Sequence, residues 1–285
     1  MRSAPLVIVA VALGGCGERS APVTGPPPAP APPAAARPAP RVLPAASAQR
    51  AELARLRRAD RPVYCGGDRR RLVALTFDDG PGPYTRLALK ELRAAHAHAT
   101  FFLVGRSFRA FPRRPLEEKH VGALGDHTAT HAFLPALTAG AMRRQLAAGQ
   151  HAAQHAAGIA VRLFRPPYGS FTPAVTAAAR HLGMVEVLWS VDSGDSLSGD
   201  FHVLAARMRR AIRPGAIVLM HENRGQTIRA LRSILPWLRR HRLRAVSVPE
   251  LLAADPPSRA QLRAGEAGCP AVTSGPARRS SRSRR

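Results

Sequence analysis

Two pairs of side chains in this sequence could bind a metal ion. Asp78 and Asp79 close the apolar run LVALTF, and His127 and His131 lie in the Gly- and Thr-rich segment GDHTATH. Two histidines four residues apart face the same way on a helical turn and can bind one ion. Adjacent carboxylates repel each other, and a cation bound by one of them resolves that cost while the other stays free as a base. Two His and one Asp leave coordination positions open for water, which predicts a catalytic metal site.

Each pair also has a simpler explanation. The aspartates could form a turn or a helix N-cap, because glycine and proline follow them in DDGPGP. A His pair at this spacing is weak evidence alone, since His151 and His155 repeat it in a polar helix without a partner carboxylate, which we interpret as solvated surface. The metal-site prediction therefore depends on the other polar residues that accompany the two pairs.

Further polar residues follow other predicted strands. Arg165 follows VRLF, Asp192 and Asp195 follow VEVLWSV, and His221 closes AIVLMH. In folds built from parallel strands and helices, the carboxyl ends of the strands form one rim, where active sites lie. We therefore expect these side chains and the aspartate pair to converge around one opening at this rim, the mouth of the fold.

The alternation of apolar runs with helical stretches from Leu72 onward indicates an α/β domain. The strands LVALTF, ATFFLVG, VRLF, VEVLWSV, AIVLMH and RAVSV are separated by helical patterns, and residues 113–124 are expected to be one of the helices. Continuous apolar strands are typical of a parallel sheet covered on both faces. About six or seven strands are expected, fewer than the eight of a full TIM barrel.

Composition divides the rest of the chain into segments around this single domain. The Pro- and Ala-rich stretch predicts an extended spacer, and the Arg- and Ser-rich end predicts a disordered tail. The predicted segments are a signal peptide at 1–16, a linker at 17–46, a basic helical lead-in at 47–71, the α/β domain at 72–255 and the tail at 256–285.

The first residues predict export and a lipid anchor. One positive charge precedes the apolar run 5–13, which is too short to span a bilayer. The following Leu-Gly-Gly-Cys resembles the lipobox of bacterial lipoproteins, which implies lipidation of Cys16 and attachment to a bacterial membrane outside the cytoplasm. An ordinary signal peptide with an incidental Cys16 is the alternative. Cys65 and Cys269 then remain, either as a disulfide or as two free thiols.

The charge of the chain raises the question of nucleic acid. Lys plus Arg number 43 against 18 Asp plus Glu, for a formal net charge of +25. The arginines are scattered and aromatic residues make up only 5% of the chain, so no stacking surface for bases accompanies them. We expect no nucleic-acid partner, and attraction to an anionic envelope polymer or lipid surface fits the charge better.

Five short segments together resemble a known enzyme family. TFDDGP, HTATH, RPPYG, DSGD and LMH follow in the order of the five motifs of the NodB-type polysaccharide deacetylases, carbohydrate esterase family 4. The resemblance covers roughly residues 72–252 and implies a distorted (β/α)7 TIM-like barrel. It also implies one divalent ion, usually zinc and sometimes cobalt or nickel.

The resemblance assigns roles to the metal side of the site. Asp78 would be the general base that activates water, and Arg165 would pair with it and hold it charged. Asp79, His127 and His131 would be the metal ligands.

It also assigns roles to the opposite side. The backbone N–H of Tyr168 would help to stabilise the oxyanion. Asp195 would orient His221 as the general acid on the leaving amine, and Leu219 would line the pocket for the acetyl methyl group. Ser196 departs from the family, which usually has Trp at this position, so we expect a differently shaped substrate groove.

The expected function is hydrolysis of N-acetyl groups on an extracellular or cell-wall polysaccharide that contains N-acetylglucosamine, with release of acetate. The partners would be this acetylated polysaccharide and the membrane, and we expect a monomer. Two alternatives stay open: an O-acetyl esterase of the xylan type, and a catalytically inactive glycan-binding lipoprotein. Metal content and acetate release distinguish the three.

Overall fold

The computed structural model describes residues 42–270, all of which belong to one compact unit. The predicted signal peptide with Cys16, the linker up to residue 41 and the end of the tail from residue 271 lie outside these described residues. Between residues 42 and 270, no helix combines the length and the apolar character needed to cross a bilayer.

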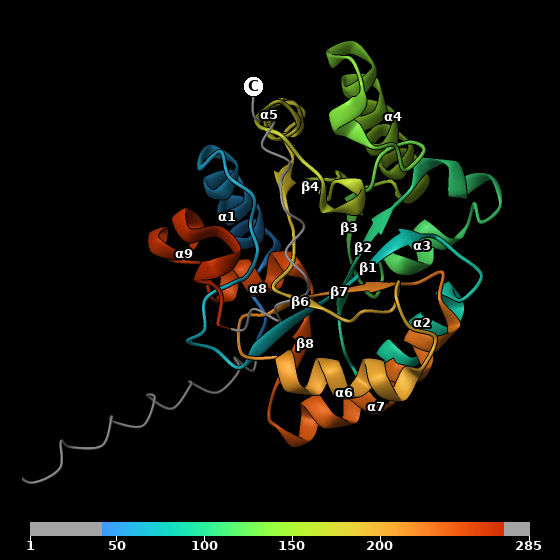
Figure 1. Cartoon of the computed structure of the whole chain (residues 1–285), viewed down its shortest axis with the longest axis vertical. Coiled ribbons are helices and arrows are strands. Elements are labelled where there is room, and N and C mark those ends of the chain that lie inside the picture. Colours follow the sequence, from blue (N-terminus) through green and yellow to red (C-terminus); the bar gives the residue numbers. More distant parts are fainter. Residues whose placement is uncertain (1–41, 271–285) are drawn as a thin grey trace, which may run out of the picture. The chain divides into compact units, whose positions relative to one another are not determined.

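The described chain is built on one parallel sheet, which confirms the predicted α/β class and the distorted barrel. Strands follow the order β5-β4-β3-β2-β1-β7-β6, and β8 pairs with β1. Helices lie around the outside of the curled sheet (Figure 1). The strands are β1 Leu72–Gly80, β2 Ala99–Leu103, β3 Gly122–Asp126, β4 Leu163–Phe164, β5 Val185–Glu186, β6 Val191–Asp192, β7 Ile217–His221 and β8 Arg244–Val246.

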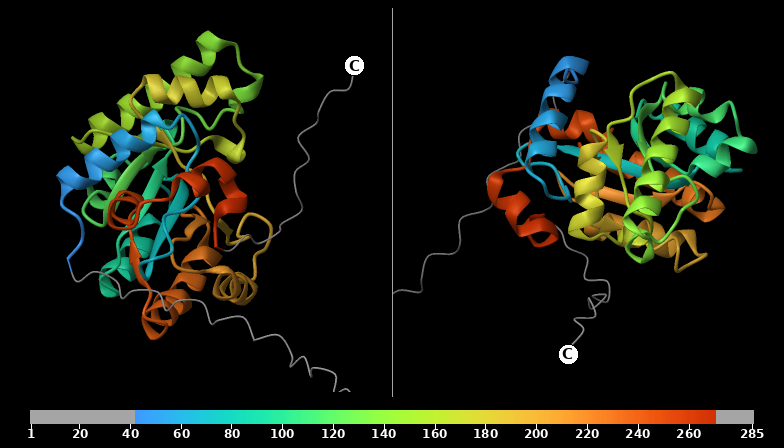
Figure 2. Two further views of the ribbon diagram at one scale, coloured as in Figure 1. Left: turned by 90° about the vertical axis from the view of Figure 1, so that its left-hand side faces the viewer. Right: turned by 90° about the horizontal axis from the view of Figure 1, so that it is seen from above.

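Most of the helices connect consecutive strands, as expected for right-handed crossovers in a parallel sheet. The two views of Figure 2 show helices on several sides of the strands. The α-helices are α1 Ala46–Arg58, α2 Thr85–Ala94, α3 Arg114–Glu118, α4 Ala139–Ala157, α5 Pro173–His181, α6 Phe201–Ala211, α7 Gly225–Arg240, α8 Val248–Ala254 and α9 Arg259–Ala264.

The central strand β1 explains how the core leads to a polar mouth. Successive side chains of a strand point to opposite faces. Val73, Leu75 and Phe77 pack with α2, α6 and α7, whereas Leu72 and Ala74 pack in a second buried cluster with α1 and α8. Burying each large apolar side chain contributes roughly 1.5–3 kcal/mol. On the second face the apolar series gives way to Thr76 and Asp78, so this face becomes polar at the carboxyl end of the strand.

The structure corrects the helix predicted at residues 113–124. Only α3 is helical there, and β3 begins at Gly122. The sequence of β3, GALGD, has no β-branched residue, so it lacks the usual pattern of a strand. Its glycines are required by close packing, because a Cβ at Gly122 would lie 1.8 Å from the carbonyl oxygen of Ala99 on β2. The segment VEVLWSV is likewise two short strands, β5 and β6, rather than one.

The described residues on either side of the domain include further helices. The predicted basic lead-in helix is α1, with Leu53 and Leu56 buried. The tail boundary predicted at 256 is too early, since α9 follows and buries Leu262. Cys65 and Cys269 form a disulfide, which decides the open choice between a bridge and two thiols. The bridge fastens the end of the described chain to the segment before β1.

Candidate active site

The predicted convergence of polar residues occurs at the carboxyl ends of the strands. Asp78 and Asp79 end β1, and Asp78 pairs in register with His221, the last residue of β7. His127 directly follows β3, and Arg165 directly follows β4. The structure therefore brings segments far apart in the sequence to one rim.

The two aspartates share the mouth because the strand is irregular. Adjacent residues of a regular strand would point to opposite faces. Here the β1–β2 register shifts between Phe77 and Gly80, and Asp79 has a left-handed backbone with φ of 66°. Both carboxylates therefore approach the same imidazole: His127 Nε2 lies 3.8 Å from Asp78 Oδ2 and 3.7 Å from Asp79 Oδ1. Such unfavourable backbone conformations cluster at functional sites.

A loop, and not a helical turn, brings the two predicted histidine ligands together. The segment after β3 has left-handed backbone at Thr128 and His131, and Thr128 Oγ1 accepts a hydrogen bond from the His131 backbone N–H at 3.0 Å. His131 Nε2 lies 3.2 Å from Asp79 Oδ1. One ligand atom from each of Asp79, His127 and His131 lies within 4.8 Å of the others. The expectation that these three side chains converge is confirmed.

The donor chemistry of this cluster fits a metal ion. His127 Nδ1 donates a hydrogen bond to the backbone carbonyl of Arg165 at 2.7 Å, which leaves the Nε2 lone pair directed to the cluster. Burial lowers the pKa of His127 and keeps the imidazole neutral, as a ligand must be. Burial acts to raise the pKa of Asp79, but the hydrogen bond from His131 and the neighbouring histidines outweigh it and lower that pKa.

Arg165 holds the carboxylate of Asp78 in place. The guanidinium is completely buried and its Nη1 donates to Asp78 Oδ1 at 2.8 Å and to Thr76 Oγ1 at 2.7 Å. Two backbone carbonyls accept from its other nitrogens, and its carbon lies 4.2 Å from the centroid of the Phe102 ring. A buried charge needs such complete hydrogen bonding. The ion pair therefore fixes the carboxylate of Asp78 in one orientation.

A second carboxylate–histidine pair faces the metal cluster. Asp195 Oδ1 accepts from His221 Nδ1 at 2.7 Å, and its Oδ2 accepts from the His221 backbone N–H at 2.7 Å and from Thr227 Oγ1 at 2.6 Å. Burial acts to lower the pKa of His221, but the hydrogen bond and charge of Asp195 outweigh it and raise this pKa to about 9. At neutral pH the imidazole is therefore protonated and can donate a proton.

The two predicted substrate-binding residues also lie at this rim. Tyr168 has a left-handed backbone with φ of 62°, and its ring centroid is 4.7 Å from that of His131. Leu219 is buried in β7 two residues before His221, so both side chains point to the same face of the sheet.

Several residues of the site were not foreseen from the sequence. Thr76 lies two residues before Asp78 on the same face of β1, and this spacing could have indicated it. Thr227, at the start of α7, carries no sequence signal. Asn223 donates to Asp79 Oδ2 at 3.3 Å. Asp192, which was expected among the converging residues, instead accepts from the Gly194 backbone N–H at 2.7 Å and so has a role in a turn.

A buried acid beside His221 adds no negative charge to the mouth. Glu222 is completely buried next to Glu118. Burial, the largest cause, raises the pKa of Glu222 to about 8, so this carboxyl is neutral at pH 7.

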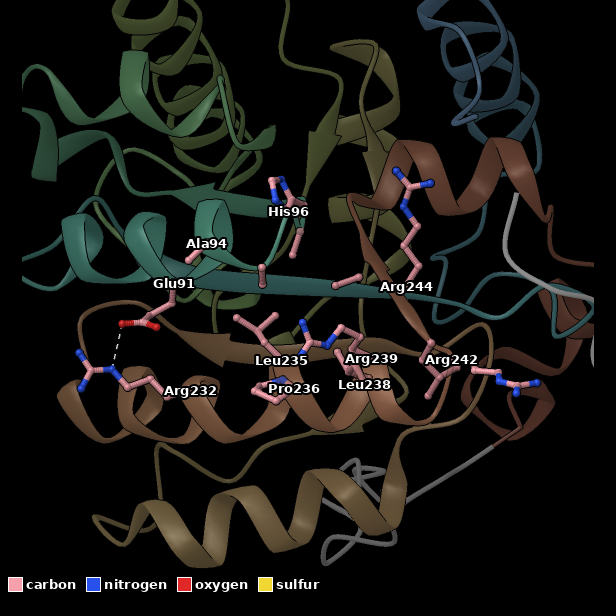
Figure 3. A pocket seen from close by; sticks show the side chains of 14 residues that line it. Glu91, Ala94, His96, Arg232, Leu235, Pro236, Leu238, Arg239, Arg242 and Arg244 are labelled. Carbon is pink, nitrogen blue, oxygen red and sulfur yellow. Dashed lines mark hydrogen bonds and ion pairs between the residues drawn. The ribbon is translucent and has the colours of Figure 1, made fainter. Parts of the chain in front are cut away.

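A cavity in the described part of the chain lies away from these residues. It has a volume of about 470 Å³ and is enclosed mainly by α2, α7 and β8. Figure 3 shows Glu91 and Arg232, which form an ion pair at 2.9 Å, at one side of it. Because β8 pairs with the first residues of β1, this cavity lies at the opposite end of the sheet from Asp78. It contributes none of the predicted site residues.

The sequence matches known carbohydrate-modifying proteins. The family model described as polysaccharide deacetylase matches residues 66–187. A chitooligosaccharide deacetylase of Bradyrhizobium sp. is 32% identical over 200 residues, which cover 64% of this chain and 90% of that protein. A peptidoglycan-N-acetylglucosamine deacetylase of Bacillus cereus is 34% identical over 191 residues, which cover 64% of this chain and 88% of that protein.

The fold is also similar to that of a solved structure from this group of proteins. The structure of a carbohydrate esterase family 4 pseudoenzyme from Bacillus anthracis superposes with a TM-score of 0.64 at 31% identity, covering 68% of this chain and 69% of that one. The chain belongs to the polysaccharide deacetylase family, the NodB-type carbohydrate esterases of family 4.

Proposed function

We propose that this chain is a metal-dependent hydrolase that removes N-acetyl groups from a polysaccharide containing N-acetylglucosamine and releases acetate. The observation that carries the proposal is the cluster of Asp79, His127 and His131 within 4.8 Å, at a mouth shared with Asp78 and His221. Relatives named as chitooligosaccharide and peptidoglycan-N-acetylglucosamine deacetylases support this class of substrate.

The metal ion would be held by one carboxylate oxygen of Asp79 and by Nε2 of His127 and His131. Two imidazoles and one carboxylate suit zinc, and cobalt and nickel accept the same donors. When bound, such an ion lowers the pKa of a water molecule and polarises an acyl carbonyl.

The remaining residues would handle protons and position the acetyl group. Asp78, held in one orientation by the hydrogen bond from Arg165, would accept a proton from the attacking water. His221, protonated at neutral pH through Asp195, donates a proton to the leaving amine nitrogen. The Tyr168 backbone N–H faces the oxyanion that forms, and the residues that surround the methyl group include Leu219.

Two other functions use the same site. An O-acetyl ester needs the same proton transfers, and Ser196 in place of the family Trp leaves room for a different glycan. The similarity to a family pseudoenzyme favours a second candidate, an inactive glycan-binding protein. Arg165 donates a hydrogen bond to Asp78, and Asp78 pairs in register with His221. The presence of these three residues together argues for the active enzyme.

Acetate release tests the proposal. Zinc-loaded protein should release acetate from N-acetylglucosamine oligomers, and Asp78→Asn should reduce the rate by roughly 10²- to 10⁴-fold while the metal stays bound. Asp192→Asn, which alters a turn, is the matched control. Activity on acetylated xylan alone would favour the esterase. Glycan binding without acetate release from any acetylated glycan would favour the inactive protein and end the enzymatic proposal.

We also propose that the protein is exported and anchored to a bacterial membrane through a lipid on Cys16. The lipobox-like sequence supports this, and the Cys65–Cys269 disulfide is typical of proteins outside the cytoplasm. Wild-type protein should fractionate with membranes and Cys16→Ala should not. Equal fractionation of the two would refute the anchor.

A further inference from the structure

Two large aromatic rings are exposed directly beside the metal cluster. Tyr168 is 59% exposed and Phe133 is 49% exposed. Their ring centroids are 6.1 Å apart with an interplanar angle of 57°, and Tyr168 is in turn 4.7 Å from His131. The rings of His131, Tyr168 and Phe133 thus form a series that leads outward from the mouth. Exposed apolar surface next to a polar site is typical of a ligand-binding surface.

Both rings are held by ordered backbone. Phe133 precedes the short helix Leu134–Ala136, and Leu134 is buried in a cluster with Met142 and Phe164. Tyr168 lies in a turn closed by a hydrogen bond from the Gly169 N–H to the Pro166 carbonyl at 3.0 Å. A ring on a fixed backbone loses little freedom when a ligand binds, so it can contribute efficiently to affinity.

The opposite side of the mouth has a different surface. The described loop after β6 carries Ser196 and Leu197, which is 80% exposed, near the Asp195–His221 pair. Trp189, earlier in the chain, packs against a buried cluster, and a Cβ at Gly169 would lie 2.6 Å from its ring. The exposed rings of Tyr168 and Phe133 therefore lie on the His131 side of the mouth.

We propose that Phe133, together with the ring of Tyr168, forms a second sugar subsite that binds the unit next to the one being deacetylated. This inference rests on the proposed function. A β-linked pyranose exposes C–H groups on its faces and hydroxyls at its edge, so one face packs on an aromatic ring while the hydroxyls stay in water. The ligand class is a neutral oligosaccharide of N-acetylhexosamine units. Phe133, one ring farther from the metal ligands than Tyr168, selects chain length and not the acetyl group.

Kinetics on two substrates test the subsite. The N-acetylglucosamine tetramer has a neighbouring unit for Phe133, whereas 4-nitrophenyl acetate has an acetyl group and no second sugar. Phe133→Ala should raise KM for the tetramer about tenfold with kcat within about twofold, the signature of lost binding without lost chemistry. The ratio of kcat/KM for tetramer over ester should fall accordingly, and Phe133→Trp should restore it. Leu116→Ala, which removes another exposed apolar side chain, on α3, is the matched control.

Three results would overturn the subsite. An unchanged ratio in Phe133→Ala, an equal loss on both substrates, or an equal fall in Leu197→Ala would each contradict it. Failure of the proposed function is separate, because wild-type protein would then release no acetate from the tetramer. In that case calorimetric binding of the tetramer decides: Phe133→Ala should weaken it about tenfold, and equal affinity or no binding by the wild type overturns the subsite.

Discussion

Two histidines at the same mouth have opposite electrostatic environments. His127 and His221 are both largely buried, and each uses Nδ1 in a hydrogen bond of 2.7 Å. The partner of His127 is the neutral carbonyl of Arg165, whereas the partner of His221 is the carboxylate of Asp195. Burial lowers the pKa of His127, while Asp195 overcomes burial and raises that of His221 to about 9.

Histidine can therefore serve two chemical roles at one site. A neutral imidazole offers a lone pair to a metal ion, and a protonated one offers a proton to a leaving group. The identity of the Nδ1 partner decides which role is available. The following variants test this contrast between the two histidines.

The largest effect is expected at the His127 side. His127→Ala should abolish stoichiometric zinc binding and reduce acetate release by about 10³-fold or more, because the cluster loses a ligand. Metal analysis and acetate assay on the same sample provide the measurement. His151→Ala, from the other pair at this spacing on α4, should retain both metal and activity. Full zinc occupancy in His127→Ala would refute the ligand assignment.

A smaller loss is expected at the His221 side. Asp195→Asn should lower kcat by roughly 10²-fold while zinc stays bound. The protonated form of His221 is the acid, so activity is lost as pH rises through its pKa. Without the carboxylate this pKa falls from about 9 toward its ordinary value, and the alkaline limb of the pH–rate profile should move to lower pH. An unmoved alkaline limb would contradict the role of Asp195.

Thr227 should have a modest effect on the same pair. Thr227→Val removes the 2.6 Å hydrogen bond to Asp195 Oδ2 but leaves the carboxylate and His221 in place. A hydrogen bond to a charged group contributes about 1.5–3 kcal/mol, and part of this should appear as a roughly tenfold lower kcat. The pH–rate profile should keep its shape. A profile that shifts as far as that of Asp195→Asn would show that Thr227 sets the charge of the pair.

The smallest effect on chemistry is expected from the disulfide. Cys65→Ser with Cys269→Ser should lower the free energy of unfolding by about 2–5 kcal/mol, measured by denaturant titration. The bridge joins segments at residues 65 and 269, outside both histidine environments. Rates at 25 °C should therefore stay within about twofold of the wild type. If the double variant lost only its bound metal, or changed only the alkaline limb of its pH–rate profile, the disulfide would position the His127 side or the His221 side of the mouth.

Much of the site could be predicted because its residues follow apolar strands. Asp78, Arg165 and His221 each end or follow such a run, and parallel strands place their carboxyl ends on one rim. The motif order added the roles of Tyr168 and Leu219, which no spacing rule supplies.

The parts that could not be predicted depend on contacts distant in sequence. The strand before His127 lacks β-branched residues, and its Gly122 packs so closely against β2 that a larger residue would not fit. The histidines meet through left-handed backbone in a loop, which spacing alone does not indicate. Thr227 joins the site only because α7 begins beside Asp195. Helix α9 and the Cys65–Cys269 bridge follow residue 256, and the sequence left the pairing of these two cysteines open.

Site-resolved nitrogen NMR of the histidine rings tests the contrast most directly. At pH 7, with and without zinc, we expect both ring nitrogens of His221 to be protonated, and His127 to be neutral with its proton on Nδ1. His127 should change at Nε2 when zinc is added. A neutral His221 at pH 7, or a His127 that is protonated and does not respond to zinc, would contradict the assignment of His221 as the acid and of His127 as a metal ligand.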